Sequence, residues 1–250
     1  MARNVTLSDL LIRLRAEARL SQSSANNNQT RDTQVAYLQR TQQWLWDNYE
    51  WPHLRVERFI DLQNGQRFYD HTQTFDTNGD VKGDLSLDRI ERIDLRYGDT
   101  WIPLTSHIGM QQYNEWSSEL DERSWPVLNW AVYEDEMVEV WPIPSQNAVI
   151  SAGSLEGRMK LIGIRNLRPL INDSDRCDLD SEVLTLTAAA EFTANKDLAR
   201  YKLDLANQRL DKLQNQLVKT TSFTMLGVGQ SNKPRRPRRM SAIYIAPSGS

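Results

Sequence analysis

The period of the hydrophobic pattern changes twice along this chain of 250 residues. Towards both ends, apolar residues recur every three or four positions, as they do on one face of an α-helix. Between these regions, from Leu54 onward, apolar and charged residues alternate with a period of two, which is typical of a half-buried β-strand. This order predicts an α+β fold, in which N- and C-terminal helices form a bundle and an antiparallel β region is inserted between them.

The N-terminal helices are predicted from their start and stop signals. The hydroxyl of Thr6 predicts the start of a first helix, which is expected to run to about Leu20. A polar loop, residues 21–30, separates it from the second helix. That helix is expected to end near Trp51, because Pro52 disfavours helical geometry in the residue before it.

The C-terminal helices are predicted from a cap and from a regular apolar stripe. Asp180 is a favourable cap for the Ala- and Leu-rich residues 182–194. Residues 197–218 form the most regular helical pattern in the chain, with apolar residues spaced by four and three positions. This stripe, which predicts a helix packed on other helices, consists of Ala199, Leu203, Ala206, Leu210, Leu213 and Leu217.

The middle of the chain is predicted to be mainly antiparallel β-structure. Residues 134–136 are expected to form the tight turn of a hairpin, and residues 106–116 a short helix. The predicted strands are 54–62, 87–97, 100–104, 127–134, 136–141 and 156–164. The chain is therefore divided into a helical bundle of residues 1–53 and 180–219, a β-rich insertion of residues 54–179, and a C-terminal arm of residues 220–250.

The charge of the chain is unevenly distributed. No acidic residue follows Asp211, and residues 212–250 hold seven of the 30 Lys and Arg residues. The first 211 residues therefore carry 23 basic against 33 acidic residues, a balance of −10. An acidic body with a segregated basic end is typical of a protein whose basic end binds a partner.

The arm, residues 220–250, is predicted to be extended and to bind a protein. Its basic run is broken by prolines and has apolar residues on both sides, which a purely electrostatic arm does not need. The alternatives are a nucleic-acid-binding arm, in which Lys and Arg neutralise phosphates, and a solvated end. The candidate binding residues are Phe223, Met225, Leu226, Lys233, Arg235, Arg236, Arg238, Arg239, Ile243, Tyr244 and Ile245.

No pattern typical of an enzyme, a cofactor site or a metal centre occurs in the sequence. His53, His71 and His107 are scattered, and none has a second His or Cys at metal-ligand spacing. Gly227-Val228-Gly229 lacks the third glycine of a phosphate-binding loop. The single cysteine, Cys177, excludes an intramolecular disulfide. We therefore expect no catalytic residues, no cofactor and no metal ligands.

The acidic residues 70–88 contain one segment that resembles a calcium loop. In Asp76-Thr77-Asn78-Gly79-Asp80 the glycine comes too early, and no Glu occupies the position of the twelfth ligand. The favoured interpretation is a solvated hairpin loop with Asn-Gly at its turn, and a weak surface cation site is the alternative.

For any one of the eight Trp residues the favoured interpretation is ordinary core, whereas the set as a whole indicates protein contacts. Trp44 and Trp46 cannot both lie on the inward face of one helix, so some Trp side chains are expected at the surface of an isolated subunit. No stretch approaches the roughly 20 apolar residues of a membrane span, and no membrane partner is expected. The pattern predicts an oligomer or an obligate partner.

Several local features carry a resemblance to a known family. They are the helix that leads from residues 33–38 to residues 46–51, the strand that ends in Trp141-Pro142-Ile143-Pro144, and the Asp-rich residues 173–180 before the Ala-rich helix around residues 188–190. In this order the chain resembles the head-to-tail adaptors of tailed bacteriophages, the ring proteins also called tail tubular protein A in short-tailed phages.

The resemblance implies a function without catalysis. It implies a structural protein of the virion, located in the phage neck and in the host cytoplasm during assembly. Its partners would be the portal protein, bound by residues 220–250, neighbouring copies in a dodecameric ring, and a tail or nozzle protein, with packaged DNA in the channel as a further candidate. The alternative function is a nucleic-acid-binding protein that uses the same arm.

Overall fold

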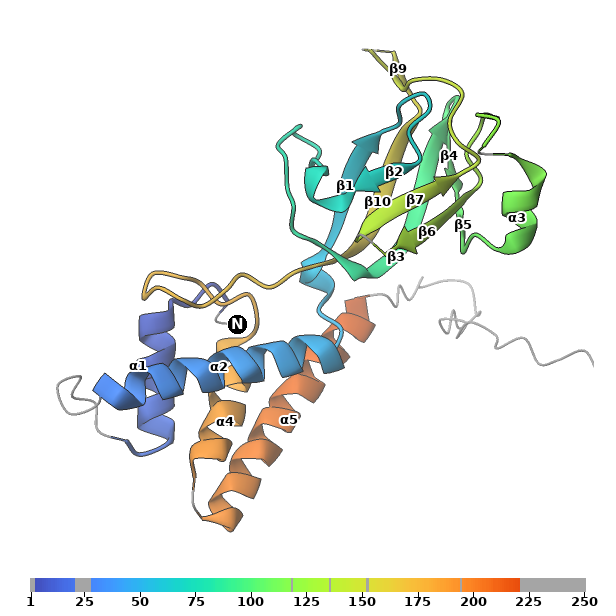
Figure 1. Cartoon of the computed structure of the whole chain (residues 1–250). Coiled ribbons are helices and arrows are strands. Elements are labelled where there is room, and N and C mark those ends of the chain that lie inside the picture. Colours follow the sequence, from blue (N-terminus) through green and yellow to red (C-terminus); the bar gives the residue numbers. More distant parts are fainter. Residues whose placement is uncertain are drawn as a thin grey trace, which may run out of the picture. The chain divides into compact units, whose positions relative to one another are not determined.

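The computed structural model of the chain describes residues 3–20, 28–117, 119–134, 136–151, 153–193 and 195–220, except for the side chains of residues 28–30 and 216–220. The chain divides into two compact units (Figure 1). The helical unit consists of Met1–Leu45 and Pro169–Ser250, and the β unit of Trp46–Arg168. Helices occur near both termini and antiparallel sheets lie between them, so the predicted α+β class is confirmed.

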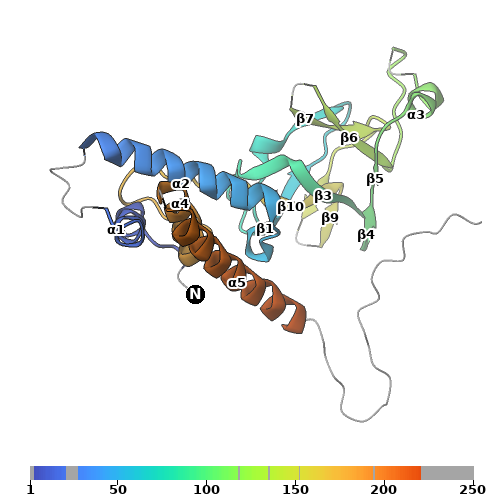
Figure 2. The ribbon, with the colours of Figure 1, turned by 90° about the horizontal axis from the view of Figure 1, so that it is seen from below.

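The helices start close to the predicted signals. The Thr6 hydroxyl accepts a hydrogen bond from the backbone N–H of Asp9, and the Asp180 carboxylate accepts those of Glu182 and Val183. The helices are α1 (Leu7–Glu17), α2 (Asn28–Asn48), α4 (Ser181–Phe192) and α5 (Lys196–Thr220). Helix α2 begins inside the segment predicted as a loop and ends before Trp51, and α4 packs against both α1 and α5 (Figure 2).

The apolar stripe of α5 is partly as predicted. Ala206, Leu210 and Leu213 are buried, whereas Leu203 is 41% exposed. Its predicted place is taken by Lys202, which is only 6% exposed. The Lys202 Nζ donates a hydrogen bond to Glu17 Oε2 on α1 at 2.7 Å, and this charge partner allows the aliphatic stem of the lysine to be buried.

The β unit contains two four-stranded sheets. In the first, all neighbouring strands are antiparallel, in the spatial order β1 (Arg55–Asp61), β10 (Arg158–Arg165), β3 (Leu85–Tyr97) and β4 (Thr100–Pro103). In the second, the order is β2 (Phe68–Asp70), β7 (Met137–Trp141), β6 (Asn129–Tyr133) and β5 (Thr105–Ser106), and only the β5–β6 pair is parallel.

The remaining elements of the β unit are short. A separate hairpin is formed by β8 (Val149–Ser151) and β9 (Ser154–Glu156), helix α3 covers Met110–Glu115, and 3-10 turns cover Pro52–Leu54 and His71–Gln73. Strands β1, β3, β4, β6, β7 and β10 and helix α3 were all predicted within a few residues. Strands β2, β5, β8 and β9 have three residues or fewer, too few to display a period, and were not predicted.

The core of the β unit combines residues from both sheets. It is built on fully buried side chains such as Leu95 and Leu161 of the first sheet and Val138 and Val140 of the second. The turn between β6 and β7 is the predicted hairpin, since Tyr133 pairs with Met137 across the two strands.

We expect Asp180→Ala to destabilise the helical unit by about 2 kcal/mol, because it removes the cap of α4 and the partner of Arg209, whose Nη2 lies 3.3 Å from Asp180 Oδ2. The measurement is chemical denaturation followed by the circular dichroism of the helices. The matched control is Asp211→Ala, because Asp211 is exposed on α5. This substitution should change the unfolding free energy by less than about 0.5 kcal/mol. Equal effects of the two substitutions would contradict this role of Asp180.

The ion pair between Asp84 and Arg58 predicts that the stability of the β unit depends on pH. Burial raises the pKa of Asp84, but two hydrogen bonds from the Arg58 guanidinium, at 2.8 and 2.7 Å, and its charge outweigh this and hold the pKa below its usual value. A depressed pKa gives stability that is present above about pH 4, the unfolded value, and is lost as the pH falls through the folded value. We expect Asp84→Asn to be less stable than the parent at pH 7, and the difference to shrink below about pH 4 in denaturation curves. A difference that is independent of pH would refute the assignment.

Candidate functional site

The predicted binding residues of the arm, from Phe223 to Ile245, all lie outside the described residues. Their role therefore stays a prediction. The described part of the chain leads directly to them, because α5 ends at Thr220, where the predicted arm begins. The elements that pack against α5 hold the helix that precedes the predicted arm, and they are here called the mount of α5.

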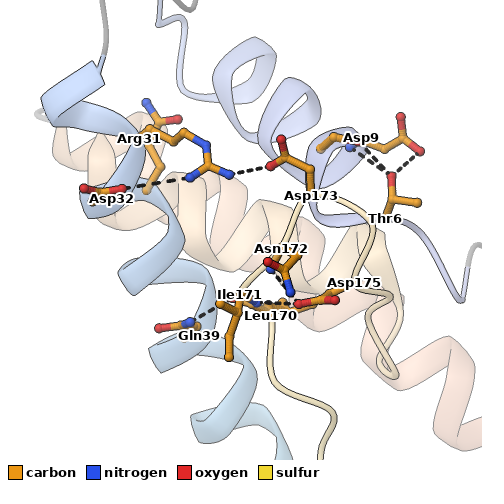
Figure 3. Close-up of polar contacts among 12 residues, drawn as sticks. Thr6, Asp9, Arg31, Asp32, Gln39, Leu170, Ile171, Asn172, Asp173 and Asp175 are labelled. Carbon is orange, nitrogen blue, oxygen red and sulfur yellow. Dashed lines mark hydrogen bonds and ion pairs between the residues drawn. The ribbon is translucent and has the colours of Figure 1, made fainter.

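One element of this mount is the segment of residues 169–180, here called the strap, which precedes α4 (Figure 3). It is tied to α2 at two points. Gln39 Nε2 donates a hydrogen bond to the carbonyl oxygen of Leu170 at 2.8 Å, and the Arg31 guanidinium points towards Asp173 and pairs with it.

The strap is also ordered internally and paired with the N-terminus. Asp175 Oδ2 accepts the backbone N–H groups of Asn172 and Ile171 at 2.6 and 2.8 Å, and these donors lower the pKa of the Asp175 carboxyl. The backbones of Val5 and Cys177 are hydrogen-bonded at 2.9 Å. The Asp-rich residues that carry the family resemblance thus have a structural part in holding α1 and α2.

A groove of about 520 Å³ lies in the helical unit between α1, α4 and α5. Its lining combines small and apolar side chains with charged ones. The lining residues are Arg13, Ala16, Glu17, Ser181, Glu182, Thr185, Leu186, Leu205, Gln208, Arg209 and Lys212. We call this the α1/α4/α5 groove.

The acids of the α1/α4/α5 groove are already paired. Glu17 accepts from Lys202, and Glu182 lies 3.2 Å from Arg209 Nε. Arg13 donates to the neutral hydroxyl of Ser181 at 2.8 Å. Among the described residues neither Arg13 nor Lys212 has a carboxylate partner, whereas Arg209 is shared between Asp180 and Glu182. The groove therefore presents two cations that are not in ion pairs with described residues.

The β unit holds a second cluster, centred on the buried carboxylate of Glu139, which is 2% exposed. Arg67 Nη2 lies 2.6 Å from Glu139 Oε1, and the Tyr113 hydroxyl donates to the same carboxylate at 2.9 Å. Burial and the hydrogen bond to Glu139 raise the pKa of Tyr113. The Arg67 guanidinium also lies over the rings of Phe68, Tyr113 and Trp141 at about 5 Å.

This cluster fixes helix α3 to the second sheet. Tyr113 belongs to α3 and Glu139 to β7, and the Trp141 indole N–H donates to the carbonyl oxygen of Gln112 at 2.7 Å. Side chains around Trp141, including Ile108 and Ile143, form a small apolar core beneath the helix. Helix α3 is therefore a rigid part of the β unit despite its six residues.

The segment that contains α3 carries the two most exposed large apolar side chains among the described residues. Met110 is 83% and Leu120 is 76% exposed. Residues 109–117 and 119–123, here called the α3 segment, contain Glu115, Glu119, Asp121 and Glu122 against the single base Arg123. Exposed large apolar side chains among acids make this segment a candidate for a protein contact.

The Trp prediction is confirmed at the end of α2. Trp44 is 48% exposed, whereas Trp46 is buried beneath the Arg89 guanidinium at 4.5 Å from its ring. Trp51, Trp130 and Trp141 are also buried. Most of these indoles therefore belong to the core of the β unit, and Trp44 is an exception.

The acidic loop has the geometry of a turn. Asp76 Oδ1 accepts the backbone N–H groups of Asn78 and Asp80, at 2.8 and 3.1 Å, so this oxygen is engaged by the loop itself. Within the described ranges no three His, Cys, Asp or Glu side chains are grouped as metal ligands. In the same part of the chain no helix is both long and apolar enough to cross a bilayer.

Comparison with known families shows which family the chain belongs to. The family model of the SU10 adaptor protein matches residues 5–230, which is most of both units. The chain belongs to the SU10 adaptor protein family. This membership supports the predicted phage head–tail adaptor, a structural protein of the virion with a non-enzymatic role. It does not extend to the narrower resemblance to tail tubular protein A, and no curated protein matches the chain.

The C-terminal limit of the SU10 adaptor match falls inside the predicted arm. The match includes the first apolar residues, Phe223, Met225 and Leu226, and it stops before the basic run that begins at Lys233. The basic run and the apolar residues after it are thus a feature of this chain that the family match leaves unassigned.

We expect Arg67→Met to destabilise the β unit by about 3 kcal/mol, because it leaves the Glu139 carboxylate buried without a cation. The double variant Arg67→Met/Glu139→Gln should recover much of this loss, since no buried charge remains and Tyr113 keeps an acceptor. Thermal unfolding of the single and double variants, followed by Trp fluorescence, provides the measurement. A double variant that is no more stable than the single variant would contradict the explanation.

Proposed function

We propose that the protein is the adaptor subunit of a phage neck, which forms a ring, binds the portal through residues 220–250 and provides the platform for the tail. The observation that carries this proposal is the SU10 adaptor match over residues 5–230, which includes the whole β unit and most of the helical unit. In this proposal the protein acts in the virion and is present in the host cytoplasm during assembly.

The helical unit supports the proposal because it holds α5, the helix that precedes the arm, in a defined position. Helix α5 is fixed near its start by the Lys202–Glu17 pair and further along by Arg209, which contacts Asp180 and Glu182 on the strap and α4. Because α5 continues to Thr220, the arm begins at a defined point of the subunit. The cost of placing its binding residues on a partner is thereby reduced.

A ring would multiply the effect of each arm. Neighbouring copies, twelve by the resemblance, would present their arms to the portal at the same time, so that weak individual contacts add up to a durable joint. The remaining partners in the proposal are a tail or nozzle protein on the opposite side and packaged DNA in the channel.

The composition of the arm favours a protein partner over a nucleic acid. Apolar residues stand on both sides of the basic run, and the first 211 residues have a balance of −10, which opposes a broad contact with phosphates. Basic and apolar groups together fit an acidic protein surface with apolar hollows.

We expect deletion of residues 220–250 to leave the subunit folded and to abolish its attachment to the purified portal. Two full-length variants separate the contributions: Gln in place of the five basic residues from Lys233 to Arg239, and Ser in place of Ile243, Tyr244 and Ile245. For an arm that binds protein through both kinds of group, each variant should lower portal occupancy, measured by electron microscopy and sedimentation.

Two outcomes would count against the proposal. A truncated protein that still decorates portals at wild-type occupancy would exclude the arm as the attachment. DNA binding that is steeply salt-dependent and lost with the basic residues, with an unchanged portal occupancy for the apolar variant, would favour the nucleic-acid-binding alternative.

A further inference from the structure

We infer that the α3 segment of one copy docks in the α1/α4/α5 groove of a neighbouring copy, and that this contact closes the ring laterally. The inference rests on the proposed ring. It deepens that proposal by naming the two surfaces that meet.

The α3 segment is suited to be the inserted surface. Met110 projects into solvent from helix α3, which Tyr113 and Trp141 fix to the second sheet, so little conformational freedom of the helix would be lost on binding. Leu120 also projects into solvent, and Arg123, three residues further on, donates a hydrogen bond to Asn64 Oδ1 at 2.8 Å. Exposure of such large apolar side chains is costly for a subunit that remains alone. A partner surface that covers them would remove this cost.

The acids of the α3 segment define the charge of that partner. Asp121 is paired with Arg123, and Glu122 accepts the backbone N–H of Ser117. For Glu119 the described residues offer no cation. The segment therefore presents a negative charge directly beside Leu120 and selects for a surface that is both apolar and basic.

The α1/α4/α5 groove has this complementary chemistry. Leu186 and Leu205 contribute apolar lining, and Arg13 and Lys212 are its cations without a carboxylate partner among the described residues. Its volume of about 520 Å³ is of the size that accepts a few side chains. An acidic Leu-bearing segment satisfies both features at once.

The two surfaces also have the symmetry that a ring requires. A closed ring is built by a heterologous contact, in which two different patches of the same chain meet between successive copies. The α3 segment belongs to the β unit and the groove to the helical unit, so each copy offers one of each. A second copy is thus the occupant to which the observations point.

Cross-linking through introduced cysteines tests the contact. Leu120→Cys on the α3 segment and Leu205→Cys in the groove are combined in one chain and treated with a short bismaleimide, with and without the purified portal. The native Cys177 is fully buried and stays in place as an unreactive thiol. We expect the double variant to give a ladder of covalent oligomers.

Mixtures of single variants make the test directional. Leu120→Cys mixed with Leu205→Cys should give only dimers with one copy of each, because every chain then carries a single reactive thiol. Leu203→Cys is the matched control: it lies on α5, is exposed, and does not line the groove. Equal cross-linking of Leu120→Cys to positions 203 and 205, or a linkage within one chain of the double variant, would overturn the inference.

Charge reversal provides a second test that needs no new thiol. We expect Arg13→Glu/Lys212→Glu to weaken self-association by at least about tenfold, since it places acids opposite Glu119. Arg200→Glu, which is exposed on α5 outside the groove, should have little effect. Adding Glu119→Lys to the double variant should restore association, and failure of this rescue together with normal folding would refute the pairing.

Failure of the inference is distinguishable from failure of the proposed function. A wild-type protein that forms no oligomer either alone or on the portal would remove the ring itself. A wild-type ring that survives every substitution in the groove and in the α3 segment would keep the ring and reject these two surfaces.

Discussion

The helical unit depends on one buried carboxylate, that of Asp180. Its two oxygens have separate partners: one caps the start of α4 and the other meets Arg209 on α5. A buried charge is tolerated only where such partners are present, so the two helices are held in one arrangement. Helix α5 ends at Thr220, where the predicted arm begins, so this interaction fixes the helix that precedes the predicted arm.

The β unit uses the same principle for a different purpose. Glu139 is buried and is compensated by Arg67 and Tyr113, and the result is a short helix, α3, fixed to a sheet. A six-residue helix has little stability of its own, so its order comes from tertiary contacts. Met110 is exposed on that fixed helix and Leu120 on the residues that follow it, and these are the side chains of the proposed contact between copies.

Much of the fold could be predicted from local signals. The caps at Thr6 and Asp180 and the hairpin around residues 134–136 depend on groups within a few residues of one another, and the structure confirms them. The stripe of α5 was predicted less well. Spacing alone placed Leu203 inside, whereas the structure buries Lys202, because Glu17 on another helix supplies its charge partner.

The sequence by itself determined the α+β class, the order of the elements and the separation of a basic end from an acidic body, because periodicity, capping and charge are local properties of a chain. Only the tertiary structure decided which charges are compensated and which stay available. Arg13 and Lys212 look no different from other basic residues in the sequence, and Leu120 looks no different from other leucines. Arg13 and Lys212 line a groove, and Leu120 projects from the surface, because residues far apart in the chain pack together. Such long-range packing leaves no periodic trace in the sequence.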